Sequence, residues 1–296
     1  MYIQIDAVMK RIIGLVALLA VVALCVSCHG RKQTDGVGDV SLSDARLQLD
    51  TFSADRYLLL AHDEDSNGIH SDYTICWPRQ GQLPDSIESR LVEFLFGKQY
   101  KASALSFAEC CEAFLNDISL ILMDDDDYSA AIPTPNAIVL DSFRSDFYHS
   151  TKSVSLDVID LGQLVTFCRH YDFYVRGMPH GIYDCSYLTL DRATNRIVPL
   201  TDLMDTTDLG RVIRLAIDLP SNDGEMLRDC LFDPDKNLPT PSQFMIDSTR
   251  SNIIFVYGLY EIMPYACGIP SIVVPVEWLS KQVYFTPYAK ELLLRQ

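Results

Sequence analysis

Histidine is the side chain best suited to acid–base chemistry near neutral pH, and His180 has the most suggestive surroundings of the histidines in this sequence. It lies between Gly177 and Gly181 and follows Met178-Pro179. In such a loop the histidine could act as a base or bind a ligand, which makes Met178, His180 and Gly181 candidate ligand-binding residues. The alternative, which the spacing favours, is a turn that the two glycines shape and that His180 caps.

A second group of residues combines tyrosines with an acid and a proline. The group consists of Tyr257, Tyr260, Glu261, Pro264 and Tyr265. Aromatic faces suit sugar rings or a protein partner, so Tyr260, Glu261 and Tyr265 are candidate ligand-binding residues. Groups of this composition are also typical of turns packed into a core, and the sequence favours that structural role.

One stretch has the spacing of a calcium-binding loop. Asp63, Asp65, Asn67 and Gly68 stand at positions 1, 3, 5 and 6 of an EF-hand pattern. Position 12 is Thr74 rather than glutamate, and the flanking segments have strand-like rather than helical patterns. Because Asn67-Gly68 is also the strongest hairpin signal in the chain, we expect a solvated hairpin tip. A weak calcium loop at Asp63, Asp65 and Asn67 is the alternative, and no other metal site or cofactor is predicted.

The catalytic signals in the sequence are weak. Strand alternation places His170 and Asp172 on one face, but a triad is not predicted because no nucleophile is identifiable beside them. The chain contains no G-x-S-x-G, Walker, G-x-G-x-x-G or H-E-x-x-H motif. We therefore expect a protein without catalysis, and the alternative is a hydrolase whose site has no recognisable motif.

The charge balance narrows the range of partners. The 296 residues include 24 Lys and Arg against 40 Asp and Glu, which gives a net charge of −16. Such a charge argues against nucleic acid and against docking on anionic lipid, and it suits a body that meets cationic partners. An apolar fraction of 48% is ample for a packed core.

The N-terminus has the pattern of a bacterial lipoprotein signal. Lys10 and Arg11 precede a run of 15 uncharged, mostly apolar residues, which is shorter than the ~20 residues needed to span a bilayer. Ser27 and Cys28 follow and resemble a lipobox, in which the cysteine is lipidated and becomes the first residue. We expect residues 1–27 to be removed, which leaves a body of −17 because that segment carries a net charge of +1. The alternatives are an uncleaved anchor and a secretory signal that is cut nearby.

Behind this segment, the hydrophobic periodicity indicates an α+β fold with antiparallel sheets and a few packed helices. The expected strands cover residues 45–52, 56–61, 73–77, 153–159, 164–175, 182–190, 196–200, 244–246, 252–257 and 271–274. The expected helices cover residues 85–97, 106–122, 207–219, 224–230, 276–282 and 287–294. We expect four parts: a signal peptide at 1–27, a flexible Gly-rich tether at 28–43, an N-terminal domain at 44–150 and a C-terminal domain at 151–296.

Seven cysteines follow Cys28, and because this number is odd at least one of them has no disulfide partner within the chain. None has the C-x-x-C spacing of a redox or zinc site. We expect most of them to be small core residues, with one disulfide at most. They are Cys76, Cys110, Cys111, Cys168, Cys185, Cys230 and Cys267.

Two stretches of the C-terminal half are similar to a known family. The first reads Phe-Tyr-Val-Arg-Gly-Met-Pro-His-Gly-Ile at 173–182 and continues through a hairpin at 187–203. The second reads Tyr-Glu-Ile-Met-Pro-Tyr-Ala-Cys-Gly at 260–268, followed by a strand and helix at 272–279. They resemble the Gly-Gly-Ala-His-Gly-like loop and the Tyr-Glu-Ile-x-Pro-Tyr-Ala-x-Gly signature of the RsiV-like C-terminal domain, found in PdaC- and RsiV-like envelope lipoproteins. Met178-Pro179 replaces the small residues of the family's loop.

The resemblance implies an envelope protein whose part before residue 150 corresponds to the accessory domain of PdaC-like proteins. A domain of this family binds a cationic lysozyme, and the acidity of this chain suits such a partner. We therefore expect a binding or sensing module for a cationic lysozyme-like protein or a peptidoglycan-related glycan. Its lipidated Cys28 would anchor it in the cell envelope, facing the periplasm or at the outer membrane. An envelope hydrolase and a structural envelope protein are the alternatives.

Substitution of the predicted lipidation site tests the anchor. We expect Cys28→Ser to release the protein from membranes or to leave an uncleaved precursor, because the serine hydroxyl does not replace the thiol that is lipidated. Membrane fractionation with intact-mass measurement checks this. A variant that stays with membranes at the mature size, as the unsubstituted protein does, would show that the lipoprotein prediction is wrong.

Overall fold

The structure, a computed structural model, describes residues 46–60, 68–101, 105–117, 137–140 and 150–294. Two sets of predicted residues lie outside these ranges: the signal peptide and tether with Cys28, and the candidate calcium loop with Asp63, Asp65 and Asn67. Both remain predictions. Within the described ranges, none of the helices has the length and apolar character required to cross a membrane.

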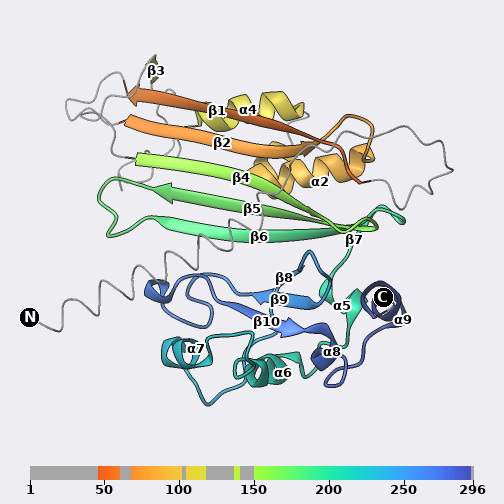
Figure 1. Cartoon of the computed structure of the whole chain (residues 1–296). Coiled ribbons are helices and arrows are strands. Elements are labelled where there is room, and N and C mark those ends of the chain that lie inside the picture. Colours follow the sequence, from red (N-terminus) through yellow and green to blue (C-terminus); the bar gives the residue numbers. More distant parts are fainter. Residues whose placement is uncertain (1–45, 61–67, 102–104, 118–136, 141–149, 295–296) are drawn as a thin grey trace, which may run out of the picture. The chain divides into compact units, whose positions relative to one another are not determined.

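Seven strands form one sheet in the order β3-β1-β2-β4-β5-β6-β7 (Figure 1). Neighbouring strands are antiparallel except β2 and β4, which run parallel from the Ile69–Ser150 pair to the Ile75–Leu156 pair. A parallel pair needs a long crossover, and this one carries helices α2 to α4 and the edge strand β3. The strands are β1 Leu49–Leu60, β2 Gly68–Pro78, β3 Ala137–Leu140, β4 Ser150–Asp160, β5 Leu164–Tyr174, β6 Ile182–Asp191 and β7 Arg196–Ile197.

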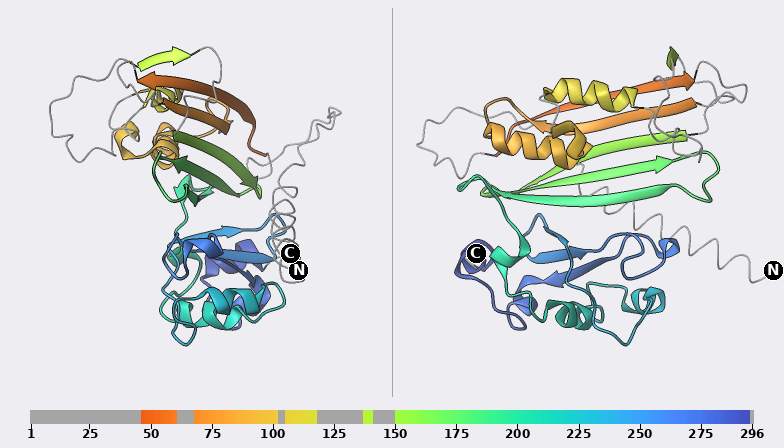
Figure 2. Two further views of the ribbon diagram at one scale, coloured as in Figure 1. Left: turned by 90° about the vertical axis from the view of Figure 1, so that its left-hand side faces the viewer. Right: turned by 180° about the vertical axis from the view of Figure 1, so that it is seen from behind.

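Helices of the crossover cover one face of this sheet (Figure 2). Helix α2, Asp85–Phe96, ends at Gly97, whose positive φ of 104° favours glycine. The four-residue α3, Lys98–Lys101, follows it. Helix α4, Phe107–Asn116, begins with a capping box, in which Ser106 and Glu109 satisfy each other's backbone N–H groups. The buried residues of α2 and α4 pack with those of the strands into one core, which includes Ile75, Leu91, Leu95, Phe114, Leu115, Leu156 and Phe167.

The opposite face of the sheet is polar because successive side chains of a strand point to opposite faces. One row of cross-strand partners on this face runs from Asp55 through Asp72, Ser153 and Asp172 to Tyr183. The Ser153 hydroxyl donates a hydrogen bond of 2.8 Å to the Asp72 carboxylate. We call these five residues the acidic row.

The rest of the described chain forms a three-stranded antiparallel sheet in the order β10-β9-β8, surrounded by short helices. A second hydrophobic core lies here, with Phe255, Ile272 and Val274 fully buried. The backbone N–H of Tyr187 on β6 donates to the Gln243 side chain on β8 at 2.7 Å, which joins the two sheets. The elements are α5 Leu200–Leu203, α6 Leu209–Ala216, α7 Gly224–Cys230, β8 Gln243–Ile246, β9 Asn252–Val256, the 3-10 helix η2 Tyr265–Cys267, β10 Ser271–Pro275, α8 Val276–Leu279 and α9 Pro287–Leu293.

The α+β prediction is confirmed, and most element bounds agree with the sequence analysis to within a few residues. Four expectations differ from the structure. The helix expected at 106–122 ends at Asn116, and its residues 118–122 lie outside the described ranges. The strand expected at 73–77 begins earlier, at Gly68. The strands expected at 45–52 and 56–61 are one continuous strand, β1, because the polar residues between them are paired with β2 along their whole length. The short strand expected at 196–200 ends at Ile197, and α5 begins at Leu200. The seven-stranded sheet contains strands from both sides of the predicted domain boundary at residue 150.

A buried lysine joins α4 to the helix-covered face of the sheet. Lys152 on β4 is only 1% exposed, and its Nζ donates a hydrogen bond of 2.5 Å to the Asp117 carbonyl. The ammonium also lies 3.7 Å from the Asp117 carboxylate and 4.6 Å from the centre of the Phe114 ring. Burial lowers the pKa of Lys152 from 10.5 to about 8, although the Asp117 carboxylate opposes that shift.

This shift predicts a pH dependence of stability. Because the pKa of Lys152 is lower in the folded chain, the unfolded state binds more protons between pH 8 and pH 10.5. The free energy of unfolding should therefore rise with pH in this window, by about 2 kcal/mol between pH 8 and pH 10 relative to Lys152→Met. Urea unfolding at both pH values measures the difference. The exposed Lys281, substituted to Met, is the control and should show no such divergence.

Candidate functional site

The two motif-bearing stretches of the C-terminal half meet in a cluster of rings. The His180 ring stacks on Tyr265, with ring centres 4.0 Å apart and an angle of 16° between the planes. Tyr260 lies 6.1 Å from Tyr265 in a nearly parallel arrangement, and Tyr183 meets Tyr265 edge-on at 5.2 Å. We call His180, Tyr183, Tyr260 and Tyr265 the ring cluster. The structure thus brings three of the candidate residues together from positions about 80 residues apart.

The loop between β5 and β6 presents His180 to this cluster. Gly177 adopts a φ of 91°, and the backbone N–H of Met178 donates to the Val175 carbonyl at 3.1 Å. Nδ1 of His180 is 2.9 Å from the Gly181 carbonyl and so donates to it. Nε2 then accepts from the Tyr260 hydroxyl, at 3.4 Å. His180 both closes its own turn and offers a ring face to the cluster, whereas Met178 is not part of the ring cluster.

Gly181 packs closely against the end of β5. A Cβ added at this position would lie 3.2 Å from the Phe173 carbonyl oxygen, which is closer than most such contacts. A larger residue would push the loop away from the end of β5, and the His180 ring would move with it. Gly181 therefore acts as a positioning residue for the ring cluster.

The second stretch forms a tight turn after β9. The Glu261 backbone N–H donates to the Gly258 carbonyl at 3.2 Å, and its carboxylate accepts from the Gly258 N–H at 2.7 Å. Glu261, a candidate binding residue, therefore uses its carboxylate to close the turn. Tyr260 has a φ of 60° and a 55% exposed side chain. A bulky residue in this left-handed region costs on the order of 1 kcal/mol, and here the result is an outward-facing ring.

Tyr257 differs from the other tyrosines of this stretch. It is 1% exposed, and its hydroxyl donates to the Pro239 carbonyl at 3.0 Å. Burial, followed by the Glu261 charge, raises its pKa. Tyr257 is a core residue, as the structural interpretation of the motif predicts for this group.

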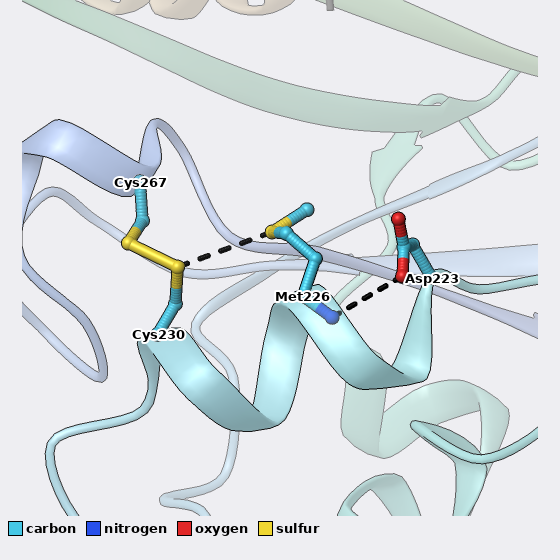
Figure 3. Close-up of a disulfide and its surroundings, with 4 residues drawn as sticks. All are labelled: Asp223, Met226, Cys230 and Cys267. Atoms are coloured by element: carbon cyan, nitrogen blue, oxygen red, sulfur yellow. Dashed lines mark hydrogen bonds between the residues drawn. A yellow bond between two sulfur atoms is a disulfide. The ribbon is translucent and has the colours of Figure 1, made fainter. Parts of the chain in front are cut away.

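A disulfide fixes the position of Tyr265. Cys230, the last residue of α7, is bonded to Cys267, the last residue of η2, and their Cα atoms are 6.1 Å apart (Figure 3). Asp223 caps α7 by accepting from the Met226 N–H at 3.2 Å. A disulfide that closes a 37-residue segment stabilises a fold by about 3–4 kcal/mol in the chain-entropy description. Because Tyr265 begins the three-residue η2, this cross-link also orders the centre of the ring cluster.

The acidic residues and tyrosines at the ring cluster have shifted pKa values. Burial raises the pKa of Asp172, and the Asp72 carboxylate in the same acidic row adds to the shift. The pKa values of Tyr183 and Tyr265 are also raised, by burial first and then by neighbouring groups that include Asp172 for Tyr265. Both hydroxyls therefore stay protonated at neutral pH. The acidic row ends at Tyr183, so it leads directly into the ring cluster.

The sequence analysis missed a nucleophile beside His170. On the polar face of the sheet, Cys185 of β6 is the cross-strand partner of His170 on β5, and its Sγ lies 3.0 Å from Nδ1 of the imidazole. Nε2 of His170 is 4.0 Å from the Asp157 carboxylate on β4. These three residues have the order of a Cys-His-Asp triad, and the expectation that His170 has no nucleophile nearby is wrong.

The surroundings of Cys185 do not activate its thiol. Burial raises the pKa of Cys185 to about 11, the Asp184 carboxylate adds to the shift, and the Arg169 guanidinium opposes it. Among the described residues, moreover, there is no group of three or more His, Cys, Asp and Glu side chains that could hold a metal ion.

The chain was compared with known families, curated proteins and solved structures. It matches no family model, and it matches no curated protein with significance. A member of the DUF3298 family from Bacteroides fragilis NCTC 9343 superposes with a TM-score of 0.60 and 19% sequence identity, over 86% of this chain and 100% of the other. A DUF3298 family protein from Pseudomonas aeruginosa PAO1 gives a TM-score of 0.50 and 16% identity, over 83% and 98% of the two chains.

At these identities the likeness establishes the fold. This chain has the fold of these two DUF3298 proteins over 83–86% of its own length and 98–100% of theirs. Those proteins are related to the RsiV- and PdaC-like domains that the two motifs resemble.

The protonated state of Cys185 predicts slow thiol chemistry. With a pKa of about 11, fewer than about one thiol in a thousand is ionised at pH 7.5, and the alkylation rate should rise about tenfold per pH unit up to pH 10. Iodoacetamide labelling followed by peptide mass spectrometry measures the rate at Cys185, with glutathione as the reference thiol. A rate above that of glutathione at pH 7, lost in His170→Ala, would contradict this and favour the hydrolase alternative.

Proposed function

We propose that this chain is a non-catalytic binding module of the cell envelope that takes a cationic protein on the polar face of its seven-stranded sheet. The observation that carries the proposal is the continuity between the acidic row and the ring cluster. Asp55, Asp72 and Asp172 lie in one cross-strand row that ends at Tyr183, and Tyr183 packs against Tyr265.

This combination suits the side chains of a basic partner. Lysine and arginine pair with carboxylates, and arginine in particular also stacks on tyrosine faces. The row supplies an exposed carboxylate at Asp55, and the cluster supplies the exposed ring of Tyr260. The chain already shows such contacts elsewhere. The Arg169 guanidinium lies 5.2 Å from the centre of the Tyr171 ring, and the Lys290 ammonium lies 4.7 Å from the centre of the Tyr284 ring.

The charge of the whole chain supports the same class of partner. A net charge of −16 attracts a basic protein over a distance of about one Debye length, ~8 Å at physiological salt, and raises its association rate. The RsiV-like resemblance points to lysozyme-like proteins as the first partners to measure. The predicted lipid at Cys28 would hold the module in the envelope, where such proteins arrive from outside.

Binding to lysozyme tests the proposal. We expect Tyr260→Asn to weaken the affinity about tenfold at 0.15 M salt, because a central aromatic anchor contributes on the order of 1–2 kcal/mol. Asparagine tolerates the φ of 60° at this position, so the turn is kept. Asp172→Asn should mainly slow association, and its effect should shrink as salt rises. Surface plasmon resonance separates the two rate constants.

The matched control is Tyr284→Asn, because Tyr284 is 60% exposed and lies outside the ring cluster. A basic protein of unrelated shape, such as cytochrome c, controls for charge alone. Equal and weak binding to both proteins, unchanged by the substitutions at Tyr260 and Asp172, would contradict the proposal. If soluble peptidoglycan fragments bind through Tyr260 and lysozyme does not bind, the ligand is a glycan rather than a protein.

A further inference from the structure

A cavity of about 400 Å³ lies outside the ring cluster and the acidic row, where two turns of the described chain meet the segment that enters β1. The segment that enters β1 forms one wall, the turn between β4 and β5 forms a second, and the turn between β8 and β9 forms the third. The lining residues are Arg46, Asp160, Leu161, Gly162, Gln163, Ser248 and Arg250.

Arg46 is held at the cavity by the residue that follows it. The backbone N–H of Leu47 donates to the Asp160 carboxylate at 2.5 Å, and the Leu47 side chain is buried in the core beneath the sheet. The Arg46 side chain is exposed, and no described residue forms an ion pair or hydrogen bond with its guanidinium. The Arg46 guanidinium, a cationic group with several N–H donors, therefore lies unpaired among the described residues at the rim of the cavity.

Arg250 enters the cavity from a tightly bonded turn. The Asp247 carboxylate accepts from the N–H groups of Thr249 and Ser251, and the Asp247 carbonyl accepts from the N–H of Arg250 at 3.0 Å. Arg250 has a φ of 59°, in the left-handed region. Its guanidinium donates through one nitrogen to the Leu161 carbonyl, which aims the side chain at the turn between β4 and β5.

The charge of this cavity is opposite to that of the chain. Its lining contains two guanidinium groups and one carboxylate, that of Asp160, whereas the chain as a whole carries −16. Both oxygens of Asp160 are engaged by backbone N–H groups, one from Leu47 and one from Gly162 at 2.7 Å. These bonds offset part of the negative charge that would oppose an anion. The hydroxyl of Ser248 adds an uncharged donor.

We propose that this cavity binds a phosphate group. Guanidinium groups match phosphate oxygens in geometry and charge, and two of them with a hydroxyl supply donors for several of its oxygens. The volume exceeds that of phosphate alone, so the cavity accommodates a small substituent such as glycerol. The phosphate comes either from a phospholipid headgroup or from a free phosphate compound. A phospholipid headgroup is a reasonable source because Arg46 follows the predicted lipidation site Cys28 by only 18 residues. The predicted anchor would therefore hold the cavity close to the membrane surface.

The experiment uses the full chain in uncharged detergent at constant ionic strength. Inorganic phosphate and glycerophosphoglycerol, the soluble headgroup of phosphatidylglycerol, are titrated separately while the backbone amide signals of Gly162 and Arg250 are followed by NMR. We expect saturable shifts with at least one of them. Arg46→Gln and Arg250→Gln should each weaken binding about tenfold, because each removes one charge-assisted contact. Arg250→Lys keeps the positive charge and should lose less affinity than Arg250→Gln.

Two variants guard against misinterpretation. Arg46 has no structural bond among the described residues, so Arg46→Gln tests the charge without disturbing the turns. Arg211→Gln makes the same change of net charge at an exposed arginine that pairs with Asp208 away from the cavity, and it should bind like the unsubstituted chain. Tighter binding of glycerophosphoglycerol identifies a lipid headgroup as the source, and tighter binding of inorganic phosphate identifies a free phosphate.

Three results would overturn the proposal. One is the absence of saturation with either compound up to about 100 mM, which is weaker than any specific affinity. Another is binding that Arg46→Gln and Arg250→Gln leave unchanged. The third is an equal loss in Arg211→Gln, which would assign the effect to overall charge rather than to this cavity.

Discussion

The parallel pairing of β2 with β4 determines which side chains the seven-stranded sheet buries and which it exposes. It joins the β1–β2 hairpin to the β4–β7 strands, so that Ile75 and Leu156 face the helices while Asp72 and Ser153 face the other way. Because side chains alternate with a period of two, a slip of one residue would exchange the two faces. Apolar side chains would then enter water and carboxylates would enter the core. The acidic row therefore exists only because the core fixes this register.

The ring cluster depends on a different constraint, the fixed position of the turn after β9 beside β6. The Cys230–Cys267 disulfide ties η2 to α7, and the Glu261 carboxylate closes the turn that carries Tyr260. Neither bond involves an atom of the four rings. They order the rings before any partner arrives, which reduces the entropy that binding would otherwise lose. A motif with a structural glutamate can therefore still present the Tyr260 ring outward.

The sequence predicted local features well and distant contacts poorly. Gly97 ends α2 as expected, and the strands β5 and β6 were predicted from their alternation. Counting back from the turn between them would have paired His170 with Cys185, so that contact was accessible in principle. The parallel β2–β4 pairing could not be predicted, because about 70 residues separate the two strands. Hydrophobic periodicity identifies a strand but does not identify its neighbour in the sheet. Tyr183 was missed for the same reason, since its role depends on the position of Tyr265.

The net charge of the chain averages over two surfaces, the acidic face of the sheet and the arginine-lined cavity, whose electrostatic interactions respond differently to salt. In the proposed function, the acidic face would attract a basic protein at a distance, through a field that ions screen over about 8 Å at physiological strength. In the proposed phosphate site, Arg46 and Arg250 would act at contact, because the two guanidinium groups oppose the field of a chain that carries −16. Screening therefore weakens attraction of a basic protein to the face, while it also weakens the repulsion that an anion meets on its way to the cavity. Opposite salt dependences of the two association rates follow from one distribution of charge, and they distinguish these surfaces even where the equilibrium affinities are alike.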